Sequence, residues 1–311
     1  MTPVPSTDDF RAAVLAGLSR RRRAIPCRWL YDEIGSALFE VICTLPEYYL
    51  TRAETALLER VGPDLAELAG PGRVVVDLGA GSMSKTRLLL SALTRPAALV
   101  PVDIARRPLL THARRLAEEF PALTVEPLNA DFTRPLTLPP TVSGPVLGFF
   151  PGSTIGNLGR CEAMRLLRGL RRLGGPLLVG VDLVKDPAVL EAAYDDRAGV
   201  TAAFTGNLLA RLVRELDAEI DRRAFTHRAR WNPRRSRIEI HLVCRRATEL
   251  RVAGRRFAFG RGSAIHVEDC HKYSPEAFRR LATRAGWTPV ASWIDHGYSL
   301  HLLAPSGTSP L

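Results

Sequence analysis

A glycine-rich turn and a more distant acid are the residues of this chain whose types and spacing best suit chemistry. Residues 74–87 read Val-Val-Val-Asp-Leu-Gly-Ala-Gly-Ser-Met-Ser-Lys-Thr-Arg, so an apolar run leads into Gly79 and Gly81, and a helix is expected from about Ser84. Asp103 ends the next apolar run, 22 residues beyond Gly81. Such a turn lets the backbone approach a nucleotide-like ligand, and a following acid binds ribose hydroxyls. Because NAD enzymes and methyltransferases share this pattern, it leaves both classes open.

The elements that must position these residues alternate between strand and helix. Apolar runs separated by helical patterns predict a parallel sheet with helical crossovers. We expect strands at 74–77, 98–103, 123–128, 146–150 and 177–183, and helices at 85–93, 108–119 and 161–173. A helix over 275–285 with Ser274 as its cap then leads to strands 287–294 and 298–303, joined by a tight turn. Five parallel strands and a terminal hairpin are typical of class I methyltransferases, whereas a dinucleotide dehydrogenase continues with a sixth parallel strand.

Two segments, 1–52 and about 187–270, fall outside this pattern. The second contains a helical region over 202–216 and strand-like runs at 237–243, 250–259 and 263–268. Because the chain returns to the sheet afterwards, we expect both segments to form a cap that holds a small substrate and excludes water. The predicted domains are 53–186 with 271–311, and 1–52 with 187–270. The predicted fold class is α/β, a Rossmann-like class I methyltransferase with a seven-stranded, mostly parallel sheet and a second, substrate-binding α+β domain.

Composition narrows the possible partners. The net charge is +11, but only three of the 43 basic residues are lysine and the arginines are scattered, which disfavours a nucleic-acid-binding face. The five cysteines are widely spaced without a CxxC pair, which is typical of a reducing cytoplasm and disfavours disulfides or zinc. No apolar stretch is long enough to span a membrane. We therefore expect a cytoplasmic monomer that acts on a small molecule, with no metal, nucleic acid or membrane partner.

Several motifs resemble those of the histidine Nα-methyltransferase family of ergothioneine biosynthesis. They occur in the family's order from about residue 27 to the end of the chain. Among them are Arg28-Trp-Leu-Tyr-Asp-Glu-Ile-Gly-Ser36, Leu45-Pro-Glu-Tyr-Tyr49, Thr51-Arg-Ala-Glu54, Phe150-Pro-Gly-Ser-Thr-Ile-Gly-Asn-Leu158, Asp182-Leu-Val-Lys-Asp186 and Glu268–Tyr273. The resemblance implies a class I methyltransferase domain with a substrate-binding domain built from the N-terminus and an insertion.

The resemblance also implies a set of residues that bind S-adenosylmethionine. Asp103 matches the ribose-binding acid, and Asp131 matches the residue that contacts the adenine amino group. Alternatives remain open: Asp131 can stabilise a turn, and Ser82 or Ser84 can cap a helix. Where relatives often carry a second acid after the ribose aspartate, this chain has Ala105. The full predicted cofactor set is Gly79, Gly81, Lys85, Asp103 and Asp131.

On the acceptor side, the resemblance implies contacts to an amino acid. Tyr31 and Tyr48 match tyrosines near the substrate amino group, and the α-amino and carboxylate groups are held by residues that match Asn157, Tyr194 and Thr201. Neutral amides and phenols fix such groups without burying an unpaired charge.

The pocket for the acceptor side chain departs from the family pattern. Glu268 matches the glutamate that accepts a hydrogen bond from the substrate imidazole. Ile240, however, stands where a methionine usually packs, and Cys270 where a serine usually donates. Because isoleucine is stiffer and a thiol is a weak donor, another amino acid acceptor stays open.

The expected reaction is displacement at the sulfonium methyl of S-adenosylmethionine by a neutral α-amine, leaving S-adenosylhomocysteine. Tyr31 is the predicted catalytic residue, which orients the amine or relays its proton. By resemblance, three rounds would give the Nα-trimethyl betaine, hercynine. The first alternative is a methyltransferase of the same architecture for another amino acid. The second, a methyltransferase-like module that binds RNA or protein, is disfavoured by the glycine turn and by the lack of interleaved aromatic and basic residues.

Overall fold

The computed structural model describes residues 6–307 and divides into two compact units. Within the described residues, the first unit holds 50–184 and 271–307, and the second holds 6–49 and 185–270. Residues 1–5 and 308–311 of the predicted domains lie outside the described part of the chain. The role of the second unit in substrate binding stays a prediction.

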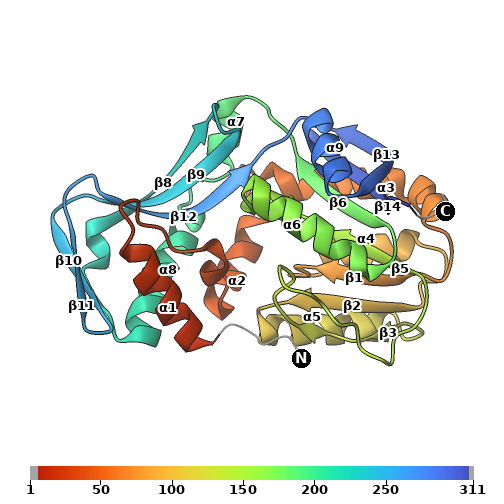
Figure 1. Ribbon diagram of the computed structural model, residues 1–311, viewed down its shortest axis with the longest axis horizontal. Coiled ribbons are helices and arrows are strands. Elements are labelled where there is room, and N and C mark those ends of the chain that lie inside the picture. Colours follow the sequence, from red (N-terminus) through yellow and green to blue (C-terminus); the bar gives the residue numbers. More distant parts are fainter. Residues whose placement is uncertain (1–5, 308–311) are drawn as a thin grey trace. The chain divides into compact units, whose positions relative to one another are not determined.

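The first unit is built on a mostly parallel sheet of order β13-β14-β6-β5-β1-β2-β3, with β4 also paired to β2 (Figure 1). Only β14 runs antiparallel to its two neighbours, β6 and β13. This order confirms the predicted α/β class with its terminal hairpin. The strands are β1 (Val74–Leu78), β2 (Ala98–Asp103), β3 (Thr124–Val125), β4 (Leu128–Asn129), β5 (Val146–Phe150), β6 (Leu177–Asp182), β13 (Trp287–Asp295) and β14 (Tyr298–Pro305).

One predicted strand of this sheet is interrupted. Residues 123–128 form two short strands, β3 and β4, rather than one, so the sheet has eight strands. Pro127 lies between them and has no N–H to donate to a ladder, which explains the break.

Helices cover both faces of this sheet. Leu167 of α6 (Arg160–Leu170) and Phe278 of α9 (Pro275–Arg284) belong to one apolar cluster with the sheet, and α5 (Arg106–Glu119) packs on β2 and β3 (Figure 1). The predicted cap of α9 is confirmed, because the Ser274 hydroxyl accepts from the N–H of Ala277 at 3.1 Å. The remaining helices of this unit are α3 (Tyr49–Ala69) and α4 (Ser84–Ala92), with 3-10 turns at Thr154–Asn157 and Arg171–Leu173.

The terminal hairpin turns through His296 and Gly297. Both residues have positive φ, 45° and 71°. Two such residues in succession make the tight turn whose twist matches paired strands. The predicted antiparallel pair is therefore confirmed, with β13 at the edge of the sheet.

The second unit combines helices with two three-stranded sheets, of order β12-β9-β8 and β11-β10-β7. Its helices are α1 (Thr7–Leu18), α2 (Glu33–Ile42), α7 (Pro187–Ala192) and α8 (Val200–Leu216), with 3-10 turns at Cys27–Leu30 and Arg222–Ala224. Its strands are β7 (Glu219–Ile220), β8 (Phe225–Asn232), β9 (Arg237–Cys244), β10 (Thr248–Val252), β11 (Arg255–Phe259) and β12 (Ala264–His271).

Two expectations for the second unit were wrong or incomplete. The run 250–259 is a hairpin rather than one strand, because Ala253 and Gly254, with φ of 48° and 71°, reverse the chain. Strand β8 was missed, since its sequence Phe-Thr-His-Arg-Ala-Arg-Trp-Asn carries few apolar residues.

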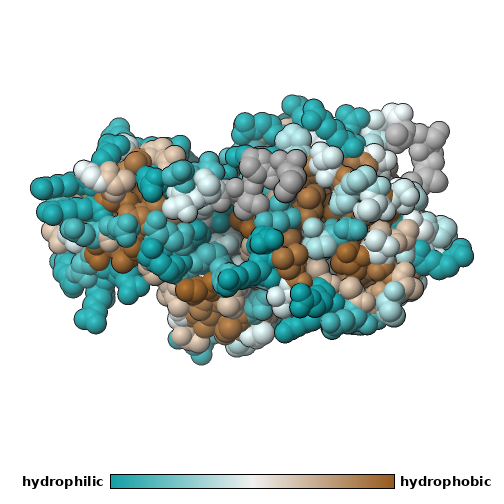
Figure 2. Space-filling model, turned by 90° about the horizontal axis from the view of Figure 1, so that it is seen from below, coloured by the Kyte–Doolittle hydropathy of each residue, from teal (hydrophilic) through white to brown (hydrophobic). Residues whose placement is uncertain are grey.

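Among the residues that the structure describes, no helix combines the length and the apolar character needed to cross a bilayer. The face drawn in Figure 2 is mostly hydrophilic, with apolar patches between hydrophilic side chains. Apolar patches of this kind are ordinary on folded proteins.

Candidate active site

The glycine turn after β1 is tied to the end of β2. The N–H groups of Gly79 and Ala80 donate to the carbonyl of Val102 at 2.8 and 3.2 Å, and that of Gly81 donates to the Asp103 carboxylate at 3.2 Å. Both glycines have positive φ, 77° and 51°. Because their N–H groups are used within the turn, what they offer a ligand is the absent Cβ, which lets the backbone come close.

Helix α4 begins directly after this turn. Its N-cap is Met83 in a left-handed conformation, without a side-chain hydrogen bond. The alternative that Ser82 or Ser84 caps the helix was therefore wrong. The first turn of α4 leaves N–H groups outside the helical pattern, and the positive end of the helix dipole favours an anion there.

The donors and acceptors of this edge fit S-adenosylmethionine. Lys85 in the first turn of α4 adds an ammonium beside those N–H groups, which suits a ligand carboxylate. Asp103 at the end of β2 and Asp131 after β4 are acceptors for hydroxyl and amino groups. The structure thus brings the five predicted cofactor residues to the carboxyl ends of β1, β2 and β4.

Asp131 also stabilises the turn in which it lies. It is 5% exposed, and one of its oxygens accepts from the N–H and the hydroxyl of Thr133 at 2.9 and 2.5 Å. Its neighbour Phe132 lies against the glycine turn, since a Cβ on Gly79 would be 3.4 Å from the Phe132 ring. The sequence analysis did not identify Phe132, although it follows Asp131 directly.

A buried acid lies beneath the turn. The Asp77 carboxylate accepts from the Thr86 hydroxyl, and burial raises the pKa of Asp77 to about 7. The Asp103 and Glu54 carboxylates raise this pKa further, whereas the Thr86 hydrogen bond and the Lys85 charge lower it. Burial also raises the pKa of Asp103. Carboxyl groups that resist ionisation are therefore concentrated beside the predicted cofactor loop.

Asn157 is the one predicted acceptor-binding residue in the first unit. It ends the 3-10 turn Thr154–Asn157 that follows β5. The other predicted acceptor residues, Tyr31, Tyr48, Tyr194, Thr201, Ile240, Glu268 and Cys270, belong to the second unit.

An aromatic cluster in the second unit surrounds Tyr31. The Tyr31 ring lies 5.3 Å from Phe204 and 5.6 Å from Phe39, measured between ring centroids. Phe39 lies 6.1 Å from Tyr48, and Tyr48 lies 6.0 Å from Tyr194. Phe39 and Phe204 carried no motif, so the sequence analysis missed them.

The Tyr31 phenol remains protonated at neutral pH. Burial raises the pKa of Tyr31 well above its ordinary value, and the Glu268 carboxylate raises it further, as do Cys27, Tyr48 and Cys270. A neutral phenol donates or accepts a hydrogen bond but does not act as a phenolate base.

An irregularity in β12 decides where Glu268 points. Strict alternation would place Glu268 on the same face as His266 and opposite to Asp269. Instead Val267 and Glu268 are both buried, and His266 Nε2 lies 2.8 Å from Asp269 Oδ1. The burial pattern therefore breaks strict alternation after Val267, as it does at a β-bulge.

The bulge turns Glu268 and Cys270 toward the buried face of the sheet. On the outer face, Arg237 of β9 pairs with Asp269 at 2.5 Å. Ile240 is three residues after Arg237 in β9, so the two side chains lie on opposite faces of the strand. Ile240 is buried and therefore lies on the inner face with Glu268. The residues of the predicted side-chain pocket therefore share one buried face: Ile240, Glu268 and Cys270.

Two residues that the sequence analysis missed hold Tyr194 and Thr201. Asp196 accepts from the N–H of Thr201 at 2.7 Å and so anchors the start of α8. Burial opposes ionisation of Asp196, but the hydrogen bonds from Thr201 and Val200 outweigh it and lower its pKa. The His227 ring lies 2.8 Å from the Tyr194 carbonyl and 2.9 Å from the Thr205 hydroxyl, so it joins Tyr194 to α8.

Known proteins match almost the whole chain. A family model described as a histidine-specific, S-adenosylmethionine-dependent methyltransferase matches residues 10–305. A histidine N-alpha-methyltransferase of Mycolicibacterium smegmatis is 38% identical over 298 residues, which cover 93% of this chain and 92% of that protein. One of Mycobacterium tuberculosis is 39% identical over 294 residues, with 92% and 91% covered.

A more distant relative is an L-tryptophan methyltransferase of Psilocybe serbica. It is 28% identical over 337 residues, which cover 97% of this chain and 94% of that protein. The family match and the sheet order agree with the resemblance found in the sequence motifs. The chain belongs to the family of histidine-specific, S-adenosylmethionine-dependent methyltransferases.

Proposed function

We propose that this enzyme transfers the methyl group of S-adenosylmethionine to the α-amino group of L-histidine. The observation that carries the proposal is the Glu268 carboxylate, which is 5% exposed and whose charge raises the pKa of Tyr31. The Glu268 carboxylate can accept a hydrogen bond from an imidazole N–H, whereas a phenyl ring offers no such donor. Two relatives at 38% and 39% identity are named histidine N-alpha-methyltransferases.

The cofactor residues act by binding and orienting. When bound, S-adenosylmethionine supplies an electrophilic methyl group. Gly79 and Gly81 give it room beside the backbone, and Lys85 receives its carboxylate. Asp103 accepts from the ribose hydroxyls, and Asp131 from the adenine amino group.

The acceptor residues prepare the amine. Asn157, Tyr48, Tyr194 and Thr201 hold the amino acid backbone, and the neutral phenol of Tyr31 hydrogen-bonds to the amine. Desolvation in this buried site disfavours the ammonium form and so helps the amine to lose its proton to water. Tyr31 orients the resulting lone pair and does not serve as a phenolate base.

The same aromatic rings suit repeated methylation. A quaternary ammonium is attracted to the faces of aromatic side chains. The cluster of Tyr31, Phe39, Tyr48, Tyr194 and Phe204 therefore supports a sequence of up to three transfers, ending in the Nα-trimethyl betaine.

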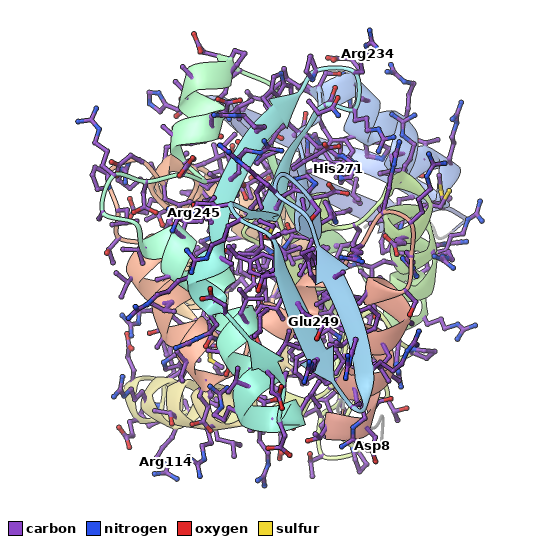
Figure 3. The ribbon with its side chains drawn as sticks, turned by 90° about the vertical axis from the view of Figure 1, so that its left-hand side faces the viewer. Asp8, Arg114, Arg234, Arg245, Glu249 and His271 are labelled. Atoms are coloured by element: carbon purple, nitrogen blue, oxygen red, sulfur yellow. The ribbon has the colours of Figure 1, made fainter. Side chains whose placement is uncertain are left out.

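The proposed partners are small molecules alone. The enzyme works as a cytoplasmic monomer, without nucleic acid or membrane. The spacing of two exposed arginines of the second unit supports the absence of a nucleic-acid-binding face. Arg234 lies in the turn between β8 and β9, and Arg245 lies beyond the far end of β9 (Figure 3). Basic side chains separated in this way do not make a continuous anionic-ligand face.

Another amino acid acceptor is the second candidate function. Ile240 and Cys270 replace residues that usually pack against and donate to the acceptor ring, and both share the buried face with Glu268. The relative at 28% identity is named an L-tryptophan methyltransferase.

A mass-spectrometric screen separates the two candidates. The purified protein is incubated with S-adenosylmethionine and each of the twenty amino acids singly, and tandem spectra locate the added methyl groups. We expect histidine to gain methyl groups on its α-nitrogen. Methylation of another amino acid with histidine unchanged would transfer the proposal to that acceptor.

A further inference from the structure

One fully buried carboxylate connects two loops of the first unit. Glu54 on α3 is 0% exposed, and its Oε2 lies 2.5 Å from the ammonium of Lys85. Both Glu54 oxygens also accept from the N–H of Gly152, at 2.8 and 3.1 Å. Glu54 thereby joins the start of α4, beside the glycine turn, to the segment that follows β5.

Both loops lead to predicted ligand-binding residues. Lys85 belongs to the cofactor set, and the chain runs from Gly152 through the 3-10 turn to Asn157. Gly152 and Ser153 both have positive φ, 75° and 55°, which is uncommon for a serine. A backbone in this conformation persists only where surrounding contacts hold it, and Glu54 supplies one of them.

The sheet leaves room for this carboxylate. Gly180 lies inside β6, where glycine weakens a strand. A Cβ at Gly180 would come within 2.1 Å of Glu54 Oε1 and 2.6 Å of the Tyr298 hydroxyl oxygen. Glycine at this position is therefore explained by the close approach of Glu54.

A second buried contact fixes the same loop. The N–H of Asp182, at the end of β6, donates to the Ser153 hydroxyl at 2.9 Å. The loop is thus held from α3 and from β6, and only the Glu54 contact is shared with the cofactor loop. Displacement of the Glu54 carboxylate must act on both loops, whereas a change at Ser153 acts on one.

We propose that Glu54 is a positioning residue that sets two ligand sites at once. Through Lys85 it determines the affinity for the carboxylate of S-adenosylmethionine, and through Gly152 it determines the placement of Asn157 for the amino acid acceptor. Lys85 has three N–H donors, so it can hold Glu54 and a ligand carboxylate together. The acceptor part rests on the proposed function, and the cofactor part does not.

Two substitutions separate the two roles. Glu54→Gln keeps an oxygen for Gly152 but removes the charge that faces Lys85, so we expect the Kd for S-adenosylmethionine to rise about tenfold while the acceptor KM changes little. Gly180→Ala displaces the carboxylate from both partners, so we expect Kd and KM to rise together. Calorimetric titration with S-adenosylmethionine and steady-state kinetics measure the two quantities. Glu59→Gln, an exposed residue of the same helix, is the matched control.

A double-mutant cycle tests whether Glu54 acts on the cofactor through Lys85. Glu54→Gln with Lys85→Gln removes both charges, which avoids leaving one buried ion without its partner. We expect the effects on Kd to be strongly non-additive. Additive effects, or a Kd and KM equal to those of the wild type in folded variants, would overturn the proposal. A Kd effect without any amino acid methylation would support the cofactor part and reject the proposed function.

Discussion

The two units place their predicted ligand-binding residues in different ways. In the first unit, Asp103 and Lys85 follow strand ends at one edge of the sheet and are fixed by the backbone turn and by a buried ion pair. In the second unit, Tyr31, Tyr194 and Glu268 come from three distant parts of the chain and meet by packing. Local turns therefore form the predicted cofactor side, and long-range packing forms the predicted acceptor side.

The electrostatics of the two sides differ accordingly. The first unit holds several buried acids near one lysine, which suits a ligand that carries both a carboxylate and a sulfonium. The second unit combines its one predicted acidic ligand, Glu268, with a cluster of phenols and phenyl rings, which suits a neutral amine and an imidazole. Changes in the first unit should affect cofactor binding or stability, and changes in the second should affect the acceptor.

The largest expected effect concerns Asp77 and stability. The folded state raises the pKa of Asp77 from 3.8 to about 7, so between these values the folded protein binds a proton that the unfolded chain has released. The free energy of unfolding therefore falls as pH rises from about 4 to about 7, and this contribution levels off above. Asp77→Asn keeps an oxygen for Thr86 and removes the ionisable group. We therefore expect this decrease in the free energy of unfolding, at most about 4 kcal/mol, to be absent in the variant.

Urea unfolding at several pH values measures this slope. Asp64→Asn, an exposed acid on α3, serves as the control and should retain the wild-type slope. The same slope in Asp77→Asn as in the wild type would show that Asp77 does not titrate in this range.

Glu268→Ala should have the next largest effect. Truncation removes a hydrogen bond to a charged group, worth about 1.5–3 kcal/mol, so we expect kcat/KM for histidine to fall about 100-fold. The Kd for S-adenosylmethionine should not change. Glu249→Ala, at an exposed position labelled in Figure 3, is the control. An equal loss of cofactor affinity would indicate that Glu268 is structural.

Tyr31→Phe should reduce kcat by about tenfold, because the variant loses one hydrogen bond to the amine, which contributes about 1 kcal/mol. The ring keeps its packing against Phe39 and Phe204, so stability should change little. The pH profile of kcat between pH 6 and 10 should keep its shape, because the pKa of Tyr31 lies well above 10. Loss of a limb from that profile would show that the phenol ionises during catalysis.

Asp269→Asn should have the smallest effect. It weakens the outer contacts with Arg237 and His266 that hold the bulge, without touching the inner face. We expect the KM for histidine to rise by roughly threefold, since the pairs are partly exposed. A wild-type KM together with reduced thermal stability would show that the bulge does not depend on these contacts.

The sequence predicted the first unit more fully than the second. Gly79, Gly81 and Asp103 lie at strand ends, so the pattern of apolar runs found both the sheet and these residues. Strand β8 and the hairpin inside 250–259 escaped, because polar residues and a turn interrupt their apolar pattern.

The facing of Glu268 could not have been read from the sequence. Alternation along β12 would place it outside, and only the bulge brings it to the buried face. Phe39, Phe204 and Glu54 likewise act through neighbours far away in the chain. Residues of this kind become visible only when the packing is known.

A competition experiment tests the acceptor assignment most directly. The enzyme is given S-adenosylmethionine and an equimolar mixture of the twenty amino acids, and initial products are identified by tandem mass spectrometry. We predict that Nα-methylated histidine dominates, and that this preference is lost in Glu268→Ala while cofactor affinity is kept. Dominance of another methylated amino acid, or methyl groups on the imidazole ring, would contradict the proposal.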